Sequence, residues 1–361
     1  MSTYREPAAD SLLPAFDVRA LARKAAVPAA LAAVVVAVLL VAGGPLHAFE
    51  DALRRALDAD PRWVAAAAVM ELLSFTGYVL LLWLIGGHAT GRLGLRESAE
   101  VTLGGAAATR LLPTGGVGGA ALTLWAFRRT GMGSRRATHT LMTFLITLYS
   151  VFLLAIMASG AALAVTGSGP LALDVVPAIG AAIVFFGHLA LAAAAPRGQA
   201  NGRIGRAAAA LGEAVRTGLG HLRSADPRLL GAIAWWAFDA AVLWAMLHAF
   251  GAPPSLAVLA LAYFVGQVGN TLPIPGAVSG GMVGILVAFS VPADLALVSV
   301  LAYRAVAIWL PAPIGLVALG SLRRTIARWG EADRVATVEP APEAIALTPR
   351  PCAERALQLA A

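Results

Sequence analysis

Long apolar tracts with almost no charge constrain this chain more than any other feature of its sequence. A helix needs about 20 mostly apolar residues to cross a bilayer, and six tracts qualify: residues 25–44, 63–86, 137–165, 174–195, 229–250 and 295–320. Only 13% of the 361 residues are charged, whereas soluble globular domains contain about 25%. The first tract is too long for the apolar region of a signal peptide, so we expect it to be retained as a membrane anchor. The sequence therefore predicts an all-α polytopic membrane protein.

Two further apolar stretches, residues 98–127 and 256–291, are interrupted near their middles by glycine and proline. Proline removes a backbone donor, and glycine allows the chain to turn back. Each stretch is therefore expected to form a re-entrant helical hairpin that enters and leaves the membrane on the same side. Irregular backbone at this depth survives only when it is buried in protein or lines a wet cavity.

The arginines set the expected orientation, because cytoplasmic loops of membrane proteins collect basic residues. If residues 98–127 formed one full span, the cluster from Arg128 to Arg136 would lie outside. The re-entrant interpretation instead places most of the 27 basic residues in the cytoplasm. For residues 256–291, two short spans would give the same orientation as a hairpin. We expect both termini on the cytoplasmic side of a bacterial inner membrane.

The predicted parts of the chain are an N-tail (1–24), a transmembrane domain (25–325) and a disordered cytoplasmic tail (326–361). Within the domain, residues 63–165 and 229–320 follow the same plan in opposite orientations. Such inverted repeats with interrupted helices are typical of transporters. The linker 196–228 carries apolar residues at helical spacing, which fits either an amphipathic helix on the inner leaflet or a solvated connector.

Four charged residues fall inside apolar tracts, where each costs at least about 2.5–3.5 kcal/mol. Glu71 and Asp239 occupy matching places in the first helix of each repeat, Arg110 precedes the first break, and Arg304 lies in the last span. Such residues are candidate functional groups. The alternative is that they form buried ion pairs that only fix the helix register.

The hairpins supply a second candidate element. Helices beginning at Gly119 and Gly281, each preceded by a further glycine (Gly118 and Gly280), would direct free N–H groups at an anion. Gln267 and Asn270 add neutral hydrogen-bonding groups. The alternative for these two is ordinary hydrogen bonding between helices.

Other chemistry has little support in the sequence. The single cysteine, Cys352, and the scattered histidines give no metal-site spacing. The glycine-rich break lacks the Lys-Ser/Thr of a nucleotide-binding loop, and no nucleophile motif is present. The net charge of +7 is explained by topology, without a nucleic acid partner. We therefore expect no cofactor and no enzymatic activity.

Two motifs resemble a known family. Leu112-Pro113-Thr114-Gly115-Gly116 with Phe127-Arg128-Arg129, and Leu272-Pro273-Ile274-Pro275-Gly276 with Tyr303-Arg304, are similar to those of the lysylphosphatidylglycerol synthase transmembrane-domain family, also described as flippase-like. The resemblance implies movement of lipids or lipid-linked glycans across a membrane. The soluble aminoacyl-transferase domain of the full-length synthases is not expected here.

The chain departs from the family pattern at three polar positions, which hold Ala120, Thr123 and Met282. The expected function is translocation of an anionic lipid, either a phospholipid or a polyprenyl-phosphate-linked precursor. The alternative is a non-catalytic scaffold for a membrane glycosyltransferase or lipid synthase.

Overall fold

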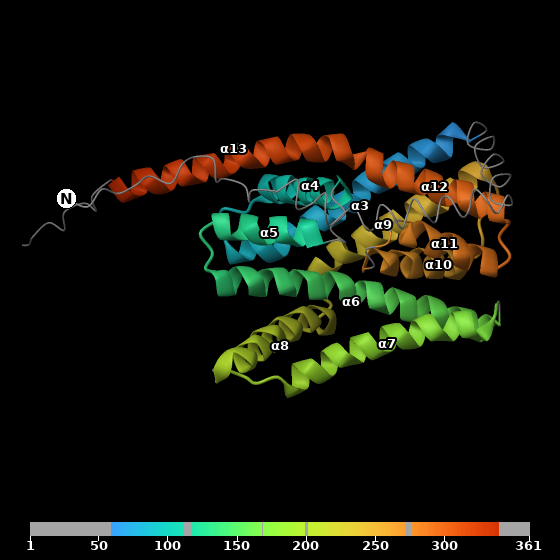
Figure 1. The fold of residues 1–361 in the computed structure, drawn as a ribbon, viewed down its shortest axis with the longest axis horizontal. Coiled ribbons are helices and arrows are strands. Elements are labelled where there is room, and N and C mark those ends of the chain that lie inside the picture. Colours follow the sequence, from blue (N-terminus) through green and yellow to red (C-terminus); the bar gives the residue numbers. More distant parts are fainter. Residues whose placement is uncertain are drawn as a thin grey trace, which may run out of the picture.

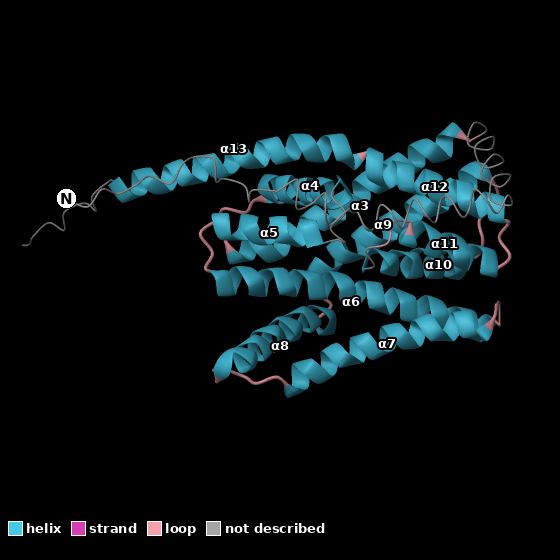
Figure 2. Ribbon diagram, in the orientation of Figure 1, coloured by secondary structure: helices cyan, strands magenta, loops and turns pink. Residues whose placement is uncertain are grey.

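A computed structural model describes residues 59–111, 117–167, 169–198, 201–271, 274 and 276–338. Throughout this part of the chain the regular structure is helical, with no strand (Figure 2). The expectation of an all-α protein is confirmed for these residues. The predicted N-tail and the first predicted span, 25–44, lie outside the described residues.

Five helical segments of the described chain are long and apolar enough to cross a membrane. They are α3 (Pro61–Ala89), α6 (Ser134–Thr166), α7 (Leu171–Ala194), α9 (Arg228–Phe250) and the run Ala293–Arg334, which combines α12 (Ala293–Trp309) with most of α13 (Pro311–Val338). Each contains one of the predicted spans to within a few residues. The chain is therefore a multi-pass membrane protein.

The last span extends further than the sequence suggested. Helix α13 continues to Val338, so the prediction of disorder from residue 326 is wrong over residues 326–338. Proline is tolerated at the first position of a helix because its missing N–H has no partner to lose. Pro311 takes this position, and the N–H of Leu310 still bonds to the carbonyl of Val306 at 3.1 Å. The two helices therefore follow one another almost without interruption (Figure 1).

Two short helical pairs form at the predicted breaks. The first consists of α4 (Leu95–Leu111) and α5 (Val117–Arg129). The second consists of α10 (Leu256–Val268), a single 3-10 turn η2 (Gly269–Thr271) and α11 (Ala277–Ala288). The two helices of each pair pack against one another.

Glycines at matching positions allow the two helices of each pair to approach closely. A Cβ added to Gly105 on α4 would lie 3.4 Å from the Cα of Gly119 on α5. A Cβ added to Gly281 on α11 would lie 3.1 Å from the Cα of Gly266 on α10. Small residues allow helix backbones to approach closely in membranes, where packing rather than water exclusion drives association.

The centre of the bundle is the contact between α3 and α9. A Cβ on Gly77 would lie 2.8 Å from the carbonyl oxygen of Gly231, and one on Gly231 would lie 2.8 Å from that of Gly77. The hydroxyl of Ser74 donates to the carbonyl of Trp235 at 2.9 Å. The indole of Trp236 on α9 donates to the carbonyl of Leu148 on α6 at 2.8 Å. These contacts fix α9 between α3 and α6.

The linker contains a helix, α8 (Gly202–Arg223), which packs on α6 and α7. Val215 and Leu219 are buried against Ile146 of α6, whereas Ile204 at the start of α8 is 87% exposed. Helix α7 itself is mostly exposed along its apolar length, as expected for a surface that faces lipid.

Candidate functional site

Asp239 forms the centre of a polar cluster inside the helical bundle. Its carboxylate is 4% exposed and accepts a hydrogen bond from the hydroxyl of Tyr263 at 2.5 Å. The hydroxyl of Tyr303 lies 3.2 and 3.3 Å from the two carboxylate oxygens. The side-chain amide of Gln267 donates to the carboxylate at 3.2 Å and to the Tyr303 hydroxyl at 2.9 Å. Charge-assisted hydrogen bonds of this kind offset part of the cost of burying a carboxylate.

Three helices position these groups. Asp239 lies on α9, Tyr263 and Gln267 are four residues apart on one face of α10, and Tyr303 lies on α12. Tyr263 and Tyr303 are both at most 1% exposed. The cluster therefore joins α9, α10 and α12 at a point inside the bundle.

The cluster reaches the surface through the end of α10. The side-chain amide of Asn270 in η2 donates to the amide oxygen of Gln267 at 2.5 Å, and Asn270 is exposed. A continuous chain of hydrogen bonds thus runs from the buried Asp239 to an exposed side chain. Asp239, Gln267 and Asn270 were predicted separately as candidate residues, and the structure brings them together.

Glu71 lies on α3, the helix that packs against α9, and is 1% exposed. The antiparallel contacts of Ser74 with Trp235 and of Gly77 with Gly231 place Glu71 at nearly the level of Asp239. The two predicted acids therefore lie at a similar depth on adjacent helices.

The predicted arginines are placed differently from the acids. Arg304 follows Tyr303 on α12 and is partly exposed. Within the described part of the chain Arg304 forms no ion pair, and the described donors to Asp239 include the neutral side chains of Tyr263, Gln267 and Tyr303. Arg110 lies in the last turn of α4, and its side chain is outside the described part of the structure.

The glycines expected to open an anion site have another role. Helix α5 begins at Val117 and α11 at Ala277, rather than at Gly119 and Gly281. The N–H of Gly119 donates to the hydroxyl of Thr109 at 2.8 Å. Gly281 is the fifth residue of α11, where the N–H bonds within the helix. The expected free N–H groups are therefore not available at these two positions.

The other two predicted glycines are their neighbours. Gly118 is the second residue of α5. Gly280 is exposed on α11, its N–H donates to the carbonyl of Gly276 at 2.7 Å, and an added Cβ would meet no atom within 4 Å.

The three positions that depart from the family pattern lie on α5 and α11. Met282 is fully buried, and its side chain occupies the space beside Gly266 between α10 and α11. The hydroxyl of Thr123 donates to the carbonyl of Gly119 at 2.9 Å and is buried. Ala120 is partly exposed on α5. Thr123 and Met282 therefore contribute to the packing of their helical pairs.

An apolar groove with a cavity volume of about 390 Å³ lies between α6, α9 and α10. Trp236 and Phe264 form part of its wall, together with small residues such as Ala240. Phe264 follows Tyr263 directly, and the ring of Trp236 lies 6.5 Å from that of Tyr263. The groove and the polar cluster are therefore on adjoining faces of α9 and α10.

Sequence reasoning missed the two tyrosines of the cluster as site residues. The available signal was the spacing of four residues between Tyr263 and Gln267, which places both on one helical face. Among the described residues no group of three or more His, Cys, Asp or Glu side chains could hold a metal ion.

A comparison with models of known protein families matches residues 25–315 to the transmembrane region of lysylphosphatidylglycerol synthase. No curated protein matched the chain. The match covers most of the sequence, including both helical pairs and every residue of the polar cluster. The chain therefore belongs to the lysylphosphatidylglycerol synthase transmembrane-region family.

Proposed function

We propose that this protein moves an anionic lipid, either a phospholipid or a polyprenyl-phosphate-linked precursor, between the leaflets of the inner membrane. The observation that carries the proposal is the chain of hydrogen bonds from buried Asp239 through Gln267 to exposed Asn270. Polar groups inside a membrane protein are costly, and they commonly mark substrate or proton pathways. Family membership adds a connection to membrane lipids.

In this proposal the chain has six full spans and two re-entrant hairpins in inverted repeats, with both termini in the cytoplasm. Helices α10 and α11 contain 13 and 12 residues. Helices of that length extend about 20 Å, less than the hydrocarbon thickness of about 30 Å. The matching glycine contacts of Gly105 with Gly119 and of Gly266 with Gly281 support a common origin for the two hairpins.

The polar cluster receives the headgroup, and the adjoining groove receives an acyl or prenyl chain. A phosphate close to ionised Asp239 would be repelled, since like charges in a low dielectric disfavour one another. Neighbouring positive charge offsets this repulsion, and the hydroxyls of Tyr263 and Tyr303 turn from Asp239 toward the phosphate. Arg304, beside Tyr303 and without an acidic partner in the described chain, supplies positive charge. Arg110 and Glu71 serve the same pathway, and no ATP is hydrolysed.

Lipid scrambling in proteoliposomes tests this proposal. Tyr303→Phe removes one hydroxyl from the cluster, and a hydrogen bond to a charged group contributes about 1.5–3 kcal/mol. The translocation rate is expected to fall at least about tenfold, since 1.4 kcal/mol corresponds to that factor. Tyr149→Phe is the matched control, because Tyr149 is 46% exposed on α6 and outside the cluster.

Two results would count against translocation. In the first, vesicles containing the wild-type protein move fluorescent phosphatidylglycerol and polyprenyl phosphate no faster than empty vesicles. In the second, Tyr303→Phe and Tyr149→Phe give the same translocation rate. The first result would favour the scaffold function for a membrane glycosyltransferase or lipid synthase.

A further inference from the structure

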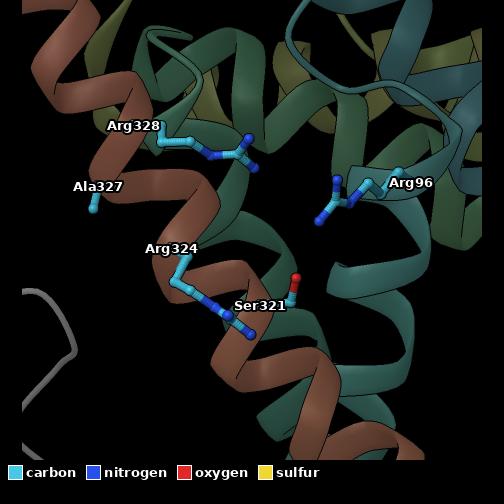
Figure 3. Close-up of a pocket in the computed structure, with 5 residues that line it drawn as sticks. All are labelled: Arg96, Ser321, Arg324, Ala327 and Arg328. Atoms are coloured by element: carbon cyan, nitrogen blue, oxygen red, sulfur yellow. The ribbon is translucent and has the colours of Figure 1, made fainter.

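A basic pocket lies between α4 and α13, away from the Asp239 cluster. Its volume is about 440 Å³, and it is lined by Arg96, Ser321, Arg324, Ala327 and Arg328. Figure 3 shows Arg328 on α13 and Arg96 on α4 extending toward one another across the gap between the helices, and Arg324 running along α13 toward Ser321. Three arginines therefore line one pocket.

Among the described acidic side chains, only Glu100 forms an ion pair with an arginine of this pocket. Glu100 is buried beneath the pocket, and one of its oxygens accepts from the Ser321 hydroxyl at 2.6 Å and from Arg96 Nε at 3.2 Å. Its other oxygen accepts from the Thr325 hydroxyl at 2.9 Å. Glu100 thus offsets one arginine and has both oxygens occupied. Further along the helices, Asp333 is already paired with Arg92.

The positive charges of Arg324 and Arg328 on α13 are not neutralised by an ion pair with a described acid. Arg328 donates to the neutral hydroxyl of Thr325 at 3.0 Å. In the part of the chain that the structure describes, neither Arg324 nor Arg328 forms an ion pair with an acid. Like charges that line one pocket repel one another, so an anion bound there would relieve the repulsion.

The geometry of the pocket is set by the packing of its two helices. Glu100 ties α4 to Ser321 and Thr325 of α13. A Cβ on Gly315 would lie 2.5 Å from the carbonyl oxygen of Leu103, so the backbones of α13 and α4 are in direct contact. The guanidinium groups are therefore presented by a fixed frame. Planar guanidinium groups form paired hydrogen bonds with phosphate oxygens.

The pocket lies at the arginine-rich end of the bundle. Arg96 is the second residue of α4, and α5 returns to the same end with Arg128 and Arg129 in its last turn (Figure 1). Basic pockets between transmembrane helices at such an end suit phosphate-bearing headgroups.

We propose that this pocket binds an anion carrying a phosphomonoester or diphosphate. Two uncompensated guanidinium groups match a dianion better than the single charge of a phosphodiester. The inference goes beyond the proposed translocation, because the pocket shares no residue with the Asp239 cluster. The phosphate could belong to a lipid headgroup or to a soluble compound, and the experiment separates these sources.

The test is native mass spectrometry of the full chain in mild detergent, mixed with phosphatidic acid, with pyrophosphate or with phosphatidylcholine. Arg324→Gln and Arg328→Gln are expected to weaken binding of the phosphate probe at least about tenfold. Arg323→Gln is the matched control, because Arg323 is exposed on α13 outside the pocket. Arg328→Lys keeps the charge but loses the planar fork, and it is expected to give an intermediate loss.

Loss of phosphatidic acid binding in the pocket variants identifies a lipid headgroup, and loss of pyrophosphate binding identifies a soluble phosphate compound. The inference is overturned if neither probe binds, or if Arg324→Gln and Arg328→Gln bind as Arg323→Gln does. Tyr303→Phe should leave this binding unchanged, so failure here is distinguishable from failure of the translocation proposal.

Discussion

Replacing Gly266 by alanine is expected to destabilise the pairing of α10 with α11. An added Cβ would lie 3.0 Å from the backbone nitrogen of Met282 and 3.1 Å from the carbonyl oxygen of Val278, and it would overlap the side chain of Met282. Backbone atoms cannot move aside as the end of a flexible side chain can. Overpacking of this kind costs about 1–3 kcal/mol.

Gly280→Ala provides the comparison that isolates this cost. Gly280 lies in a helix, as Gly266 does, but an added Cβ there meets no atom within 4 Å. Alanine in place of glycine favours a helix by about 0.8–1.0 kcal/mol, and this gain is common to both substitutions. The difference between the two variants is therefore about 1–3 kcal/mol, the steric cost alone.

Unfolding in mixed micelles of mild detergent and SDS, followed by tryptophan fluorescence, measures this difference. Gly280→Ala should be as stable as the wild type or more stable, and Gly266→Ala should unfold at a lower SDS fraction. If the two variants unfold together, the close approach of α10 and α11 through glycine is refuted.

Three further predictions concern other parts of the molecule. Glu100→Ala should lower the free energy of unfolding by about 1–3 kcal/mol, because Ser321 and Thr325 lose the acceptor that joins α13 to α4. Glu97→Ala on the same helix is the control. Equal stability of the two variants would contradict the role of Glu100. Burial and the neighbouring Arg228 lower the pKa of His221 below its ordinary value of 6.5. The folded state therefore favours neutral His221. The stability that neutral His221 contributes is complete above pH 6.5 and declines as the pH falls toward the lowered pKa. His221→Gln should flatten the plot of unfolding free energy against pH in this range, and an unchanged plot would contradict this role of His221. With Cys352 replaced by serine, single cysteines at Gly133 and Ala252, both exposed, should be labelled from opposite sides of the membrane; labelling of both from one side would contradict the proposed topology.

The membrane-crossing helices could be predicted from the sequence because they depend on local properties. Length and hydropathy located α3, α6, α7 and α9 to within a few residues. The positions of the two helical pairs followed from proline and glycine, whose backbone effects are also local. The extent of α13 was missed because the prolines from Pro340 onward favoured a disordered tail. In the structure Asp333 in this part of the helix pairs with Arg92, and Ile326 is buried.

The candidate site could be predicted only in part, for a similar reason. Buried charge marked Asp239, and polarity marked Gln267 and Asn270. Tyr303 joins them from a helix more than 60 positions beyond Asp239, a contact that no local spacing reveals. The glycines were misinterpreted because a glycine that opens an anion site and one that admits a neighbouring backbone look alike in sequence. Only the atoms opposite Gly119 and Gly281 distinguish the two roles.

The continuity of α12 and α13 has a mechanical consequence. The 42-residue run from Ala293 to Arg334 is about 63 Å long, with Tyr303 near one end and Arg324 about 32 Å further along. Treated as a rigid rod, a tilt of about 5° at Tyr303 would displace Arg324 by about 3 Å, the length of one hydrogen bond. The turn at Leu310 and Pro311, which lacks one backbone donor, is the most compliant point of this rod. Its bending stiffness determines how much of a movement at the buried cluster reaches the arginines.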